Sequence, residues 1–195
     1  MHDPLSATSA VPSLAIRNTA PRSRLTTLVR LIIAIPWYLV AALWGIASFV
    51  CVIVAWFVLL FTARYPAGLY SFVAGYARFN TRTYAFAFLL VDPLPPFDGA
   101  EHPEYPAVLR LGPPLASYSR LKVLLRIFYI IPAYVIGIIA GIALEVVGFI
   151  SWLVILVLGR QPEGLQNILR EALGWQIRYL LLITLVTETY SLEVV

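Results

Sequence analysis

The stretch SRLTTLVRLIIAIPWYLV, residues 23–40, returns 96 residues later as SRLKVLLRIFYIIPAYVI, residues 119–136. The match continues without a gap, and 21 of the 70 residue pairs between residues 23–92 and 119–188 are identical. Shared hydrophobicity gives chance identities, but it does not align arginine, proline, glycine and tryptophan at a single offset. The chain is therefore predicted to contain two tandem copies of one unit.

The composition predicts an integral membrane protein. Of the 195 residues, 61% are hydrophobic and only 12% are charged, whereas about one quarter of the residues of a soluble domain are charged. A soluble chain of this size could hold long apolar runs in its core, but so few charged residues could not cover that core.

The basic residues do not indicate a nucleic-acid partner. The chain has 14 basic and 10 acidic residues, but the basic ones are spread over the expected helix ends rather than gathered in one stripe. We therefore expect anionic lipid headgroups to be their partners.

The sequence carries no signature of catalysis, of a metal or of a cofactor. His2 and His102 are the only histidines, and neither has the spacing of a metal site. P-loop, GxGxxG, GxSxG and HExxH motifs do not occur. The sequence thus predicts a protein that has no enzymatic activity, cofactor or metal.

Each copy begins with a basic amphipathic stretch, at residues 24–35 and 120–131. Arg30 and Arg126 stand among Leu, Val and Ile there, a pattern typical of a helix that lies in the headgroup region with its arginines reaching outward. These two arginines are candidate contacts for lipid headgroups or for a partner.

A first membrane span is expected next in each copy. Pro36 and Pro132 interrupt or kink the helix. Residues 37–62 and 133–158 then run for 26 residues without a basic side chain, about 39 Å of helix at 1.5 Å per residue. Such a helix crosses a hydrocarbon core of roughly 30 Å with some tilt.

A second helical stretch is expected at residues 67–91 and 163–187. Its first half is mixed in polarity, and its second half is apolar but short for a full span. Either the whole stretch crosses the bilayer with its arginines snorkelling, or the first half lies in the interface. We favour crossing. The expected fold is an all-α membrane protein with four transmembrane helices in two two-helix repeats, each preceded by an interfacial amphipathic helix.

Two crossings per copy return the chain to its starting side, so both copies are expected to insert in the same orientation. The copies are then related by a pseudo-two-fold axis along the membrane normal. Most basic residues of the short loops lie on the side of the termini and the central linker, and such residues mark the cytoplasmic side. We therefore expect a multi-pass protein of a bacterial plasma membrane, with both termini and the linker in the cytoplasm.

Three segments lie outside the copies. Residues 1–22 lack the apolar core of a secretory signal and are expected to form a flexible tail, and residues 189–195 are expected to form a C-terminal tail. Residues 93–118 hold seven prolines and several acidic residues, so this linker is expected to run extended. The linker is either a solvated strap or a docking surface for a cytoplasmic partner.

The turn between the two helices of each copy combines arginine, proline and glycine, as LFTARYPAGL (60–69) and LVLGRQPEGL (156–165). Arginine neutralises the negative end of a helix, proline suits the first turn of the next helix, and glycine permits close packing. This chemistry describes a structural turn and interfacial anchor, and the alternative is a binding site for lipid phosphate or a partner. The residues concerned are Arg64, Tyr65, Pro66, Gly68, Arg160, Pro162 and Gly164.

Tyr65 is the part of this turn that a structural role does not require, because glutamine replaces it in the second copy. Any recognition by the turn is therefore expected in the first copy. The five tryptophans mostly fall near the ends of the predicted spans. Tryptophan is typical of the membrane interface, so most of these residues are expected to anchor their helices there. They are Trp37, Trp44, Trp56, Trp152 and Trp175.

Glu145 is the single acidic residue inside a long apolar segment, and its counterpart in the first copy is Phe49. A carboxylate at this depth is costly and normally faces protein. One interpretation is a neutral carboxyl group that is hydrogen-bonded between helices or to another subunit. The other is a proton or ion relay, or a cation site.

The blocks WFVLLFTARYPAGLYSF (56–72) and YAFAFLLVDPLPPF (84–97) resemble a family of bacterial integral membrane proteins, common in actinobacteria and catalogued only as a domain of unknown function. Members tend to carry a W-F-x-x-L-F-T-G-R-Y-P-x-G-L block and later a Y-P-P-F block. The second copy repeats this pattern but has GRQPEGL in the turn and ETYSLE in place of the Pro-Pro-Phe ending. The resemblance implies the membrane architecture and brings no activity with it.

The sequence favours a non-catalytic accessory or scaffold subunit that docks to a larger bacterial membrane complex. The alternative is an oligomeric membrane transporter, channel or lipid-binding protein that uses Glu145, and a membrane enzyme without known motifs is the third class. The expected partners are membrane lipids, together with other membrane-protein subunits or further copies of the chain.

Overall fold

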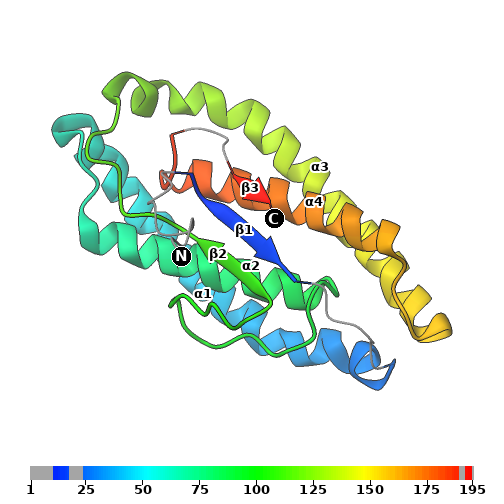
Figure 1. Cartoon of the computed structure of the whole chain (residues 1–195). Helices are drawn as coiled ribbons and strands as arrows, with labels where there is room; N and C mark the ends of the chain where they lie inside the picture. The colour runs from blue at the N-terminus through cyan, green and yellow to red at the C-terminus, as the bar shows by residue number, and fades with distance from the viewer. Residues whose placement is uncertain (1–10, 18–23, 189–191, 195) are drawn as a thin grey trace, which may run out of the picture.

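The computed structural model describes residues 11–17, 24–188 and 192–194. In these residues four helices and three short strands follow one another along the chain (Figure 1). Their order is β1 (Ser13–Ile16), α1 (Arg24–Thr62), α2 (Ala67–Ala87), β2 (Ala107–Arg110), α3 (Arg120–Leu158), α4 (Glu163–Ile183) and β3 (Glu193–Val194).

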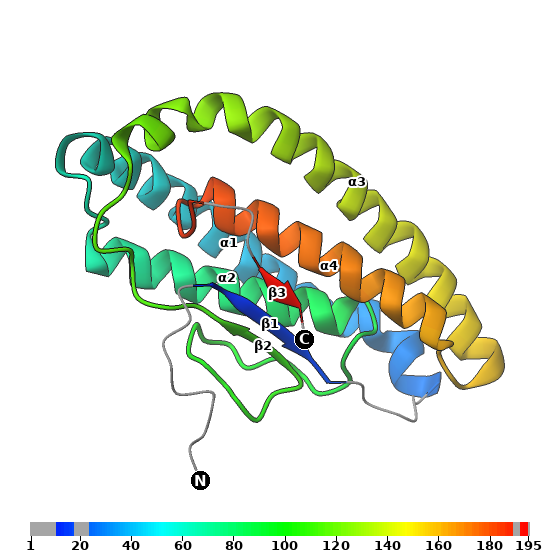
Figure 2. The same cartoon turned by 45° about the horizontal axis from the view of Figure 1, so that its top comes forward.

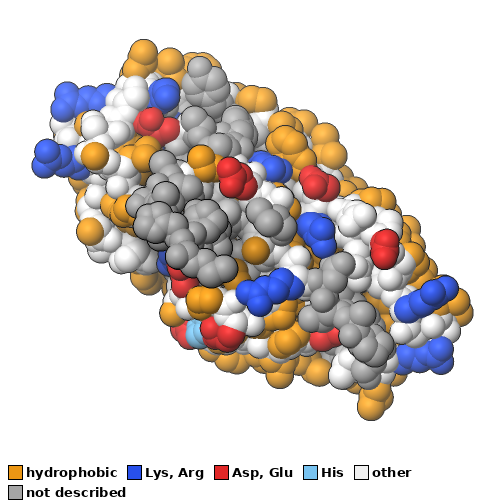
Figure 3. Space-filling view, viewed as in Figure 1, with side chains coloured by type: hydrophobic (Ala, Val, Ile, Leu, Met, Phe, Trp, Pro, Cys, Tyr) orange, Lys and Arg blue, Asp and Glu red, His pale blue; other side chains and the backbone are white. Residues whose placement is uncertain are grey.

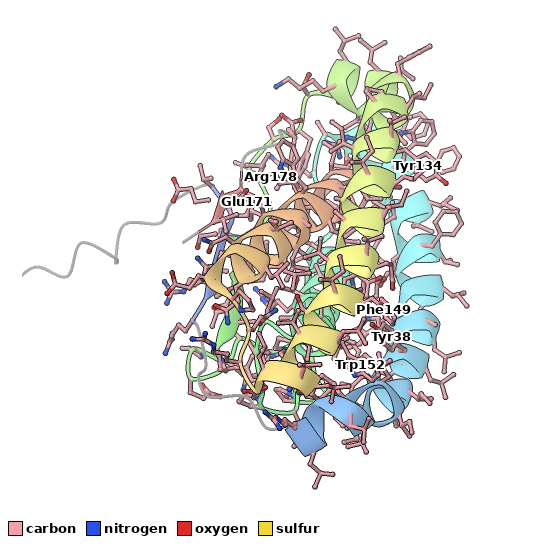
Figure 4. The ribbon with its side chains drawn as sticks, turned by 90° about the vertical axis from the view of Figure 1, so that its right-hand side faces the viewer. Tyr38, Tyr134, Phe149, Trp152, Glu171 and Arg178 are labelled. Carbon is pink, nitrogen blue, oxygen red and sulfur yellow. The ribbon has the colours of Figure 1, made fainter. Side chains whose placement is uncertain are left out.

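The helices form two layers, and the strands form a third. The helices α1 and α3 pack on each other, each also packs on the helix that follows it, and α2 and α4 are in contact. The strands lie over α2 and α4, away from α1 and α3 (Figure 2). Seen from the side, α1 and α3 form one edge of the molecule and the strands the opposite edge (Figure 4). The buried core lies between the layers and includes Leu59, Val73, Leu144, Leu169 and Leu173.

The two long helices run antiparallel, and both ends of the pair are tied by the same contact. Arg24 at the start of α1 donates to the Val157 carbonyl near the end of α3, at 3.1 Å. Arg120 at the start of α3 donates to the Phe61 carbonyl near the end of α1, at 2.9 Å. These four residues are two pairs of repeat counterparts, so each copy offers the other the same donor and the same acceptor.

A second reciprocal pair lies further inside. The indole N–H of Trp56 on α1 donates to the Val123 carbonyl on α3, at 3.1 Å. The indole N–H of Trp152 on α3 donates to the Thr27 carbonyl on α1, at 2.9 Å. Trp56 and Trp152 were expected to anchor their helices at a membrane interface, but they join the two copies instead. Their hydrogen bonds show that the copies are related by a pseudo-two-fold axis.

The direction of this axis follows from the layers. The axis exchanges α1 with α3 inside one layer and α2 with α4 inside the next, so it runs perpendicular to both layers. Long helices related in this way are antiparallel. The expectation that the spans of both copies insert in the same direction is therefore wrong.

The basic amphipathic stretches are not separate interfacial helices. Residues 24–35 and 120–131 are continuous with the apolar segments after them, so α1 and α3 are single helices of 39 residues each. Pro36 and Pro132 lie inside these helices, where the missing N–H removes one backbone hydrogen bond and permits bending. The long helix α3 is visibly arched (Figure 2).

The second helix of each copy is shorter than expected, because it ends in a left-handed residue. Leu89 and Leu185 both have φ of 63°. After α2, Leu90 donates to the Ala85 carbonyl and Leu89 donates to the Phe86 carbonyl, which is the hydrogen-bond pattern of a Schellman motif. The same pattern follows α4, so α2 ends at Ala87 and α4 at Ile183.

The expectation of an all-α fold is corrected by a small three-stranded sheet in the order β2-β1-β3. Strand β1 pairs antiparallel with β2, with Ser13 opposite Arg110, and parallel with β3, with Leu14 opposite Val194. Leu14 and Ile16 are buried, so the strand covers the helices beneath it. Residues 13–16 and 193–194, assigned to the two tails, are thus part of the fold. The rest of the expected tails, residues 1–10, 18–22, 189–191 and 195, lies outside the described residues.

The linker is folded onto α2 rather than running free. Arg82 on α2 donates to the Ala100 carbonyl, at 3.0 Å, and to the backbone carbonyl of Asp98. The indole of Trp37 donates to the Pro95 carbonyl, at 2.8 Å, and stacks on the ring of Phe97 with centroids 4.3 Å apart. Of the two interpretations of this segment, a loosely solvated strap does not fit these contacts.

Candidate membrane-binding surface

The outer layer of the molecule is an almost wholly apolar surface. Of the 36 large apolar side chains that are exposed in the described residues, 31 belong to α1 and α3. Full burial of one large apolar side chain stabilises by about 1.5–3 kcal/mol, and each of these side chains forgoes part of that in water. An exposed apolar patch of this extent marks an interaction with a membrane or a partner. Below, these exposed residues of α1 and α3 are called the apolar face.

Two helices are long and apolar enough to cross a membrane. They are Arg24–Thr62 and Ile130–Leu158, each with a mean hydropathy of 2.5 in its most apolar window. Only 17% and 22% of these windows is buried, so neither is the enclosed core helix of a soluble protein. The helices α2 and α4 do not meet the same criterion over the described residues, and four spans are therefore not shown.

Basic side chains lie at both ends of the apolar face. Arg64 follows α1 and lies at the same end as Arg120, whereas Arg160 follows α3 at the end where Arg24 lies. All four side chains are exposed, and basic groups gather at both ends of the long axis (Figure 3). Arginine at the border of an apolar surface is suited to lipid phosphate. The expected equal orientation of the copies placed both turns on one side, whereas Arg64 and Arg160 lie at opposite ends of the apolar face. Their contact with lipid phosphate stays a prediction.

The turns around these arginines have the geometry of structural turns. Ala63 and Gly159, which are repeat counterparts, both have positive φ, 55° and 72°, and each ends its long helix. Pro66 and Pro162 take the N-cap positions of α2 and α4. Gly68 and Gly164 have open space where a Cβ would stand, so close helix packing is not the reason for glycine there.

Arg30 is not a lipid contact. Its side chain is only 2% exposed and reaches the end of α2. It donates to the carbonyls of Phe86 and Val91, at 2.8 and 2.7 Å, and forms an ion pair with Asp92 at 2.5 Å. Its charge lies 4.6 Å from the centre of the Phe86 ring. A cation at this place satisfies the orphan carbonyls and the negative pole of a helix end.

Arg126 has the same role in the second copy. It is 4% exposed and donates to the Thr187 carbonyl, at 2.5 Å, just beyond the end of α4. Glu188 is the repeat counterpart of Asp92, but its contacts differ. It accepts from the Ser119 backbone N–H at 2.7 Å and lies 3.6 Å from Lys122. The two buried arginines are therefore clamps that hold the end of one helix against the start of another.

Tyr65 also belongs to the interior of the protein. It is buried, and its hydroxyl donates to the Thr184 carbonyl of the other copy at 3.2 Å. Its ring packs against Tyr70 and Tyr118. Tyr65, which was expected to carry any recognition by the turn, therefore joins the two copies. Arg64 and Arg160 are the remaining candidates in the turns for contact with phosphate or a partner.

Glu145 lies exposed on α3. It lines a hollow of about 120 Å³ between the long helices, together with Tyr38, Phe149 and Trp152, and the last three side chains lie together in Figure 4. Within the described residues Glu145 has neither a hydrogen bond nor an ion pair. The described residues thus supply no hydrogen bond between helices for Glu145, and a contact to another subunit and a role as a proton or ion site both stay predictions.

A substitution tests whether the Glu145 carboxyl group contributes to the stability of the fold. The Glu145→Gln variant is expected to change the melting temperature in detergent by about 2 °C or less, because an exposed substitution that breaks no hydrogen bond or ion pair changes stability by about 0.5 kcal/mol at most. Thermal melting followed by circular dichroism measures this. A drop several times larger would show that the carboxyl group is held by the fold.

The opposite side of the molecule carries both signs of charge (Figure 3). Arg78 pairs with Glu101 at 2.8 Å. The ring of His102 lies between Glu104, at 2.8 Å, and Asp98, at 2.9 Å, and these two hydrogen bonds raise the pKa of His102. This polar surface, made by the strands and the linker, is called the sheet face below.

The comparison with known families identifies both copies. The model of the domain of unknown function DUF4389 matches residues 24–98 and again residues 120–190. The chain belongs to the DUF4389 family. The two matches confirm the tandem duplication, and each match to DUF4389 covers the two helices of one copy and the clamp arginine that joins them. No curated protein and no solved structure matches this DUF4389 chain.

Proposed function

We propose that this DUF4389 protein is a membrane scaffold or accessory subunit without catalytic activity, which lies along one side of a bacterial plasma membrane. The apolar face enters the lipid, and the sheet face is presented to partners in the cytoplasm. The observation that carries this proposal is the division of the molecule into an apolar layer and a charged layer on opposite sides, along the full length of the long helices.

A membrane-parallel placement explains the layers better than crossing does. If α1 and α3 crossed the bilayer, the strands and linker beside α2 and α4 would lie at membrane depth as well. Exposed side chains there, such as Arg17, Glu104 and Arg110, would then face hydrocarbon, which is costly for charged groups and for open sheet edges. With α1 and α3 in the plane of the membrane, the side chains that meet lipid are apolar, apart from the basic residues at the helix ends and Glu145.

The in-plane placement agrees with the topology expected from the sequence in two respects, the direction of the pseudo-two-fold axis and the side of the termini and linker. The pseudo-two-fold axis is perpendicular to the layers, so it coincides with the membrane normal, as expected for the four-span arrangement. A chain that does not cross stays on the side where it was synthesised, which places both termini and the linker in the cytoplasm. The four expected spans become two in-plane helices and two helices that lie above them.

Labelling of single cysteines in the turns distinguishes three topologies, with in-plane helices, four spans or two spans. We start from a Cys51→Ala background, since Cys51 is the only cysteine, and introduce Gly68→Cys or Gly164→Cys, where a new Cβ has open space. In-plane helices predict that a membrane-impermeant maleimide labels neither site in intact cells and both in inverted vesicles. Four spans, with both copies in the same orientation, predict that both sites are labelled from outside. If only α1 and α3 cross, in opposite directions, one of the two sites is labelled from outside.

The control for this experiment is Ala116→Cys in the exposed part of the linker. It should be protected in intact cells and labelled in inverted vesicles in both the in-plane and the four-span topology. Labelling of either turn from outside would contradict the in-plane placement.

The scaffold role itself is tested by purification in mild detergent followed by mass spectrometry. We expect stoichiometric foreign subunits that are lost when the charge of the sheet face is reversed by Glu104→Arg and kept when Glu145 is changed to glutamine. The alternative function, a transporter or channel that uses Glu145, predicts a homo-oligomer that carries flux in liposomes and loses it with Glu145→Gln.

A further inference from the structure

The second copy contains an open hollow between α3 and α4. Its volume is about 550 Å³, within the range of small-molecule sites. The floor is made by Ala140 and Ala172, and Trp175 and Ile139 form walls. The guanidinium of Arg178 lies 4.7 Å from the centre of the Trp175 ring and holds that wall in place.

The same space in the first copy is filled by the protein's own aromatic rings. The counterpart of Ala140 is Trp44, whose ring stacks on Phe79 with centroids 5.6 Å apart and packs against Phe72 at 5.8 Å. The counterpart of Ala172 is Tyr76, 6.5 Å from Trp44. Duplication of one unit has therefore produced one closed helix pair and one hollow pair. Two alanines stand in the places of two large rings, and in the first copy Gly99 of the linker also packs against Trp44 and Gly75.

The rim of the hollow, which we call the lip, carries two polar side chains whose counterparts in the first copy are smaller residues. Glu171 and Asn167 of α4 line the hollow beside its apolar floor, and their counterparts are Gly75 and Ser71. Glu171 is exposed on α4 (Figure 4), and it has no ion pair or hydrogen bond within the described residues. A single carboxylate at an apolar cavity suits a ligand with a cationic head and an apolar body.

The hollow is continuous with the apolar face. Ile136 and Ile139 line it and are also exposed on α3, and Ile168 and Trp175 are the exposed large apolar residues of α4. The lip belongs to α4, the layer that the in-plane placement puts just above the lipid chains. A partner helix is about 10–12 Å across with its side chains, too wide for the room left by two missing aromatic rings, whereas one hydrocarbon chain is narrow and flexible.

We propose that the hollow between α3 and α4 holds one acyl chain of an amine-headed phospholipid, such as phosphatidylethanolamine, with the ammonium group beside Glu171. This proposal rests on the membrane placement of the apolar face and adds a lipid site to it. In the first copy the rings of Trp44 and Tyr76 occupy the corresponding place.

The full chain is tested in vesicles of phosphatidylethanolamine and phosphatidylglycerol that contain a phosphatidylethanolamine probe with a photoactivatable acyl chain. Peptide mass spectrometry after irradiation should find more probe on the residues of the hollow than on Ile142, an exposed residue of the apolar face. Ala140→Trp, which copies the first repeat, should lower labelling of the hollow about tenfold or more. Ile142→Trp adds the same ring outside the hollow and should leave that labelling unchanged.

Further variants keep the test decisive. Ala172→Tyr fills the hollow with the other ring of the first copy and replaces Ala140→Trp if that variant fails to fold. Glu171→Gln should remove the preference for an ethanolamine over a glycerol headgroup while the chain is still labelled. Unchanged labelling of the hollow after either ring is added would overturn the proposal. If the apolar face of α1 is also unlabelled, the membrane placement fails, whereas a labelled α1 with an unlabelled hollow refutes the lipid site alone.

Discussion

Arg30→Gln is expected to lower the stability of the protein by about 3–5 kcal/mol, the cost of removing one partner of an ion pair that is largely buried, with Arg30 2% and Asp92 30% exposed. For a chain of this length the melting temperature should fall by about 6–20 °C. The substitution leaves the Asp92 carboxylate without the cation that lies 2.5 Å away. It also leaves two carbonyls at the end of α2, those of Phe86 and Val91, without their charged donor.

The second copy supplies the matched control. Arg126→Gln removes the donor to the Thr187 carbonyl, but Glu188 keeps its contacts to Lys122 and to the Ser119 N–H. A charged hydrogen bond such as that to Thr187 contributes about 1.5–3 kcal/mol, and no carboxylate of the described residues loses its cation, so the fall in melting temperature should be smaller than for Arg30→Gln. Melting in detergent, followed by circular dichroism, measures both. An equal or larger fall for Arg126→Gln would refute the role given to the ion pair with Asp92.

Arg30→Lys separates charge from geometry. Lysine keeps the positive charge, but it cannot donate to two carbonyls and one carboxylate through a planar fork. We expect its melting temperature to lie between those of the parent protein and Arg30→Gln. Full recovery with lysine would show that the clamp acts through charge alone.

The sequence predicted the features of this fold that depend on local patterns. Both second helices begin where proline and glycine placed them, at Ala67 and Glu163, and both long helices end at Thr62 and Leu158, as the turn chemistry indicated. The duplication followed from the fixed offset of 96 residues and is confirmed by the family match. These signals are short-range, because capping and helix periodicity depend on residues that are neighbours in the chain.

The sequence did not reveal the features that depend on contacts between distant segments. The sheet joins residues 13–16, 107–110 and 193–194, three short segments whose strand pairing no local pattern specifies. The clamp arginines looked like lipid anchors, since an arginine among leucines has the same pattern whether it reaches a phosphate or a buried carbonyl. The left-handed ends at Leu89 and Leu185 carry no glycine to mark them. Comparing the two copies position by position could have found the hollow, because Trp44 aligns with Ala140.

Replacing both inter-copy tryptophans by alanine is expected to separate the two halves of the molecule. Trp56 and Trp152 each place an indole against the partner helix and donate to its backbone, at Val123 and Thr27. Truncation of a large packed ring costs about 3–5 kcal/mol, so each single alanine variant should lower the melting temperature by about 6–20 °C. The two values should be similar, because the pseudo-two-fold axis makes the sites equivalent.

The phenylalanine variants isolate the hydrogen bond. Trp56→Phe and Trp152→Phe keep most of the packing and remove one neutral donor, worth about 1 kcal/mol, so each should cost about 2–4 °C. Trp175→Ala, which removes an indole outside the contact between the copies, should cost less than either alanine variant at the two contact sites. In the double alanine variant, hydrogen exchange should become faster along the facing sides of α1 and α3 while the contact between α3 and α4 stays protected. Unchanged exchange between the long helices would mean that the reciprocal tryptophans do not hold the two DUF4389 units together.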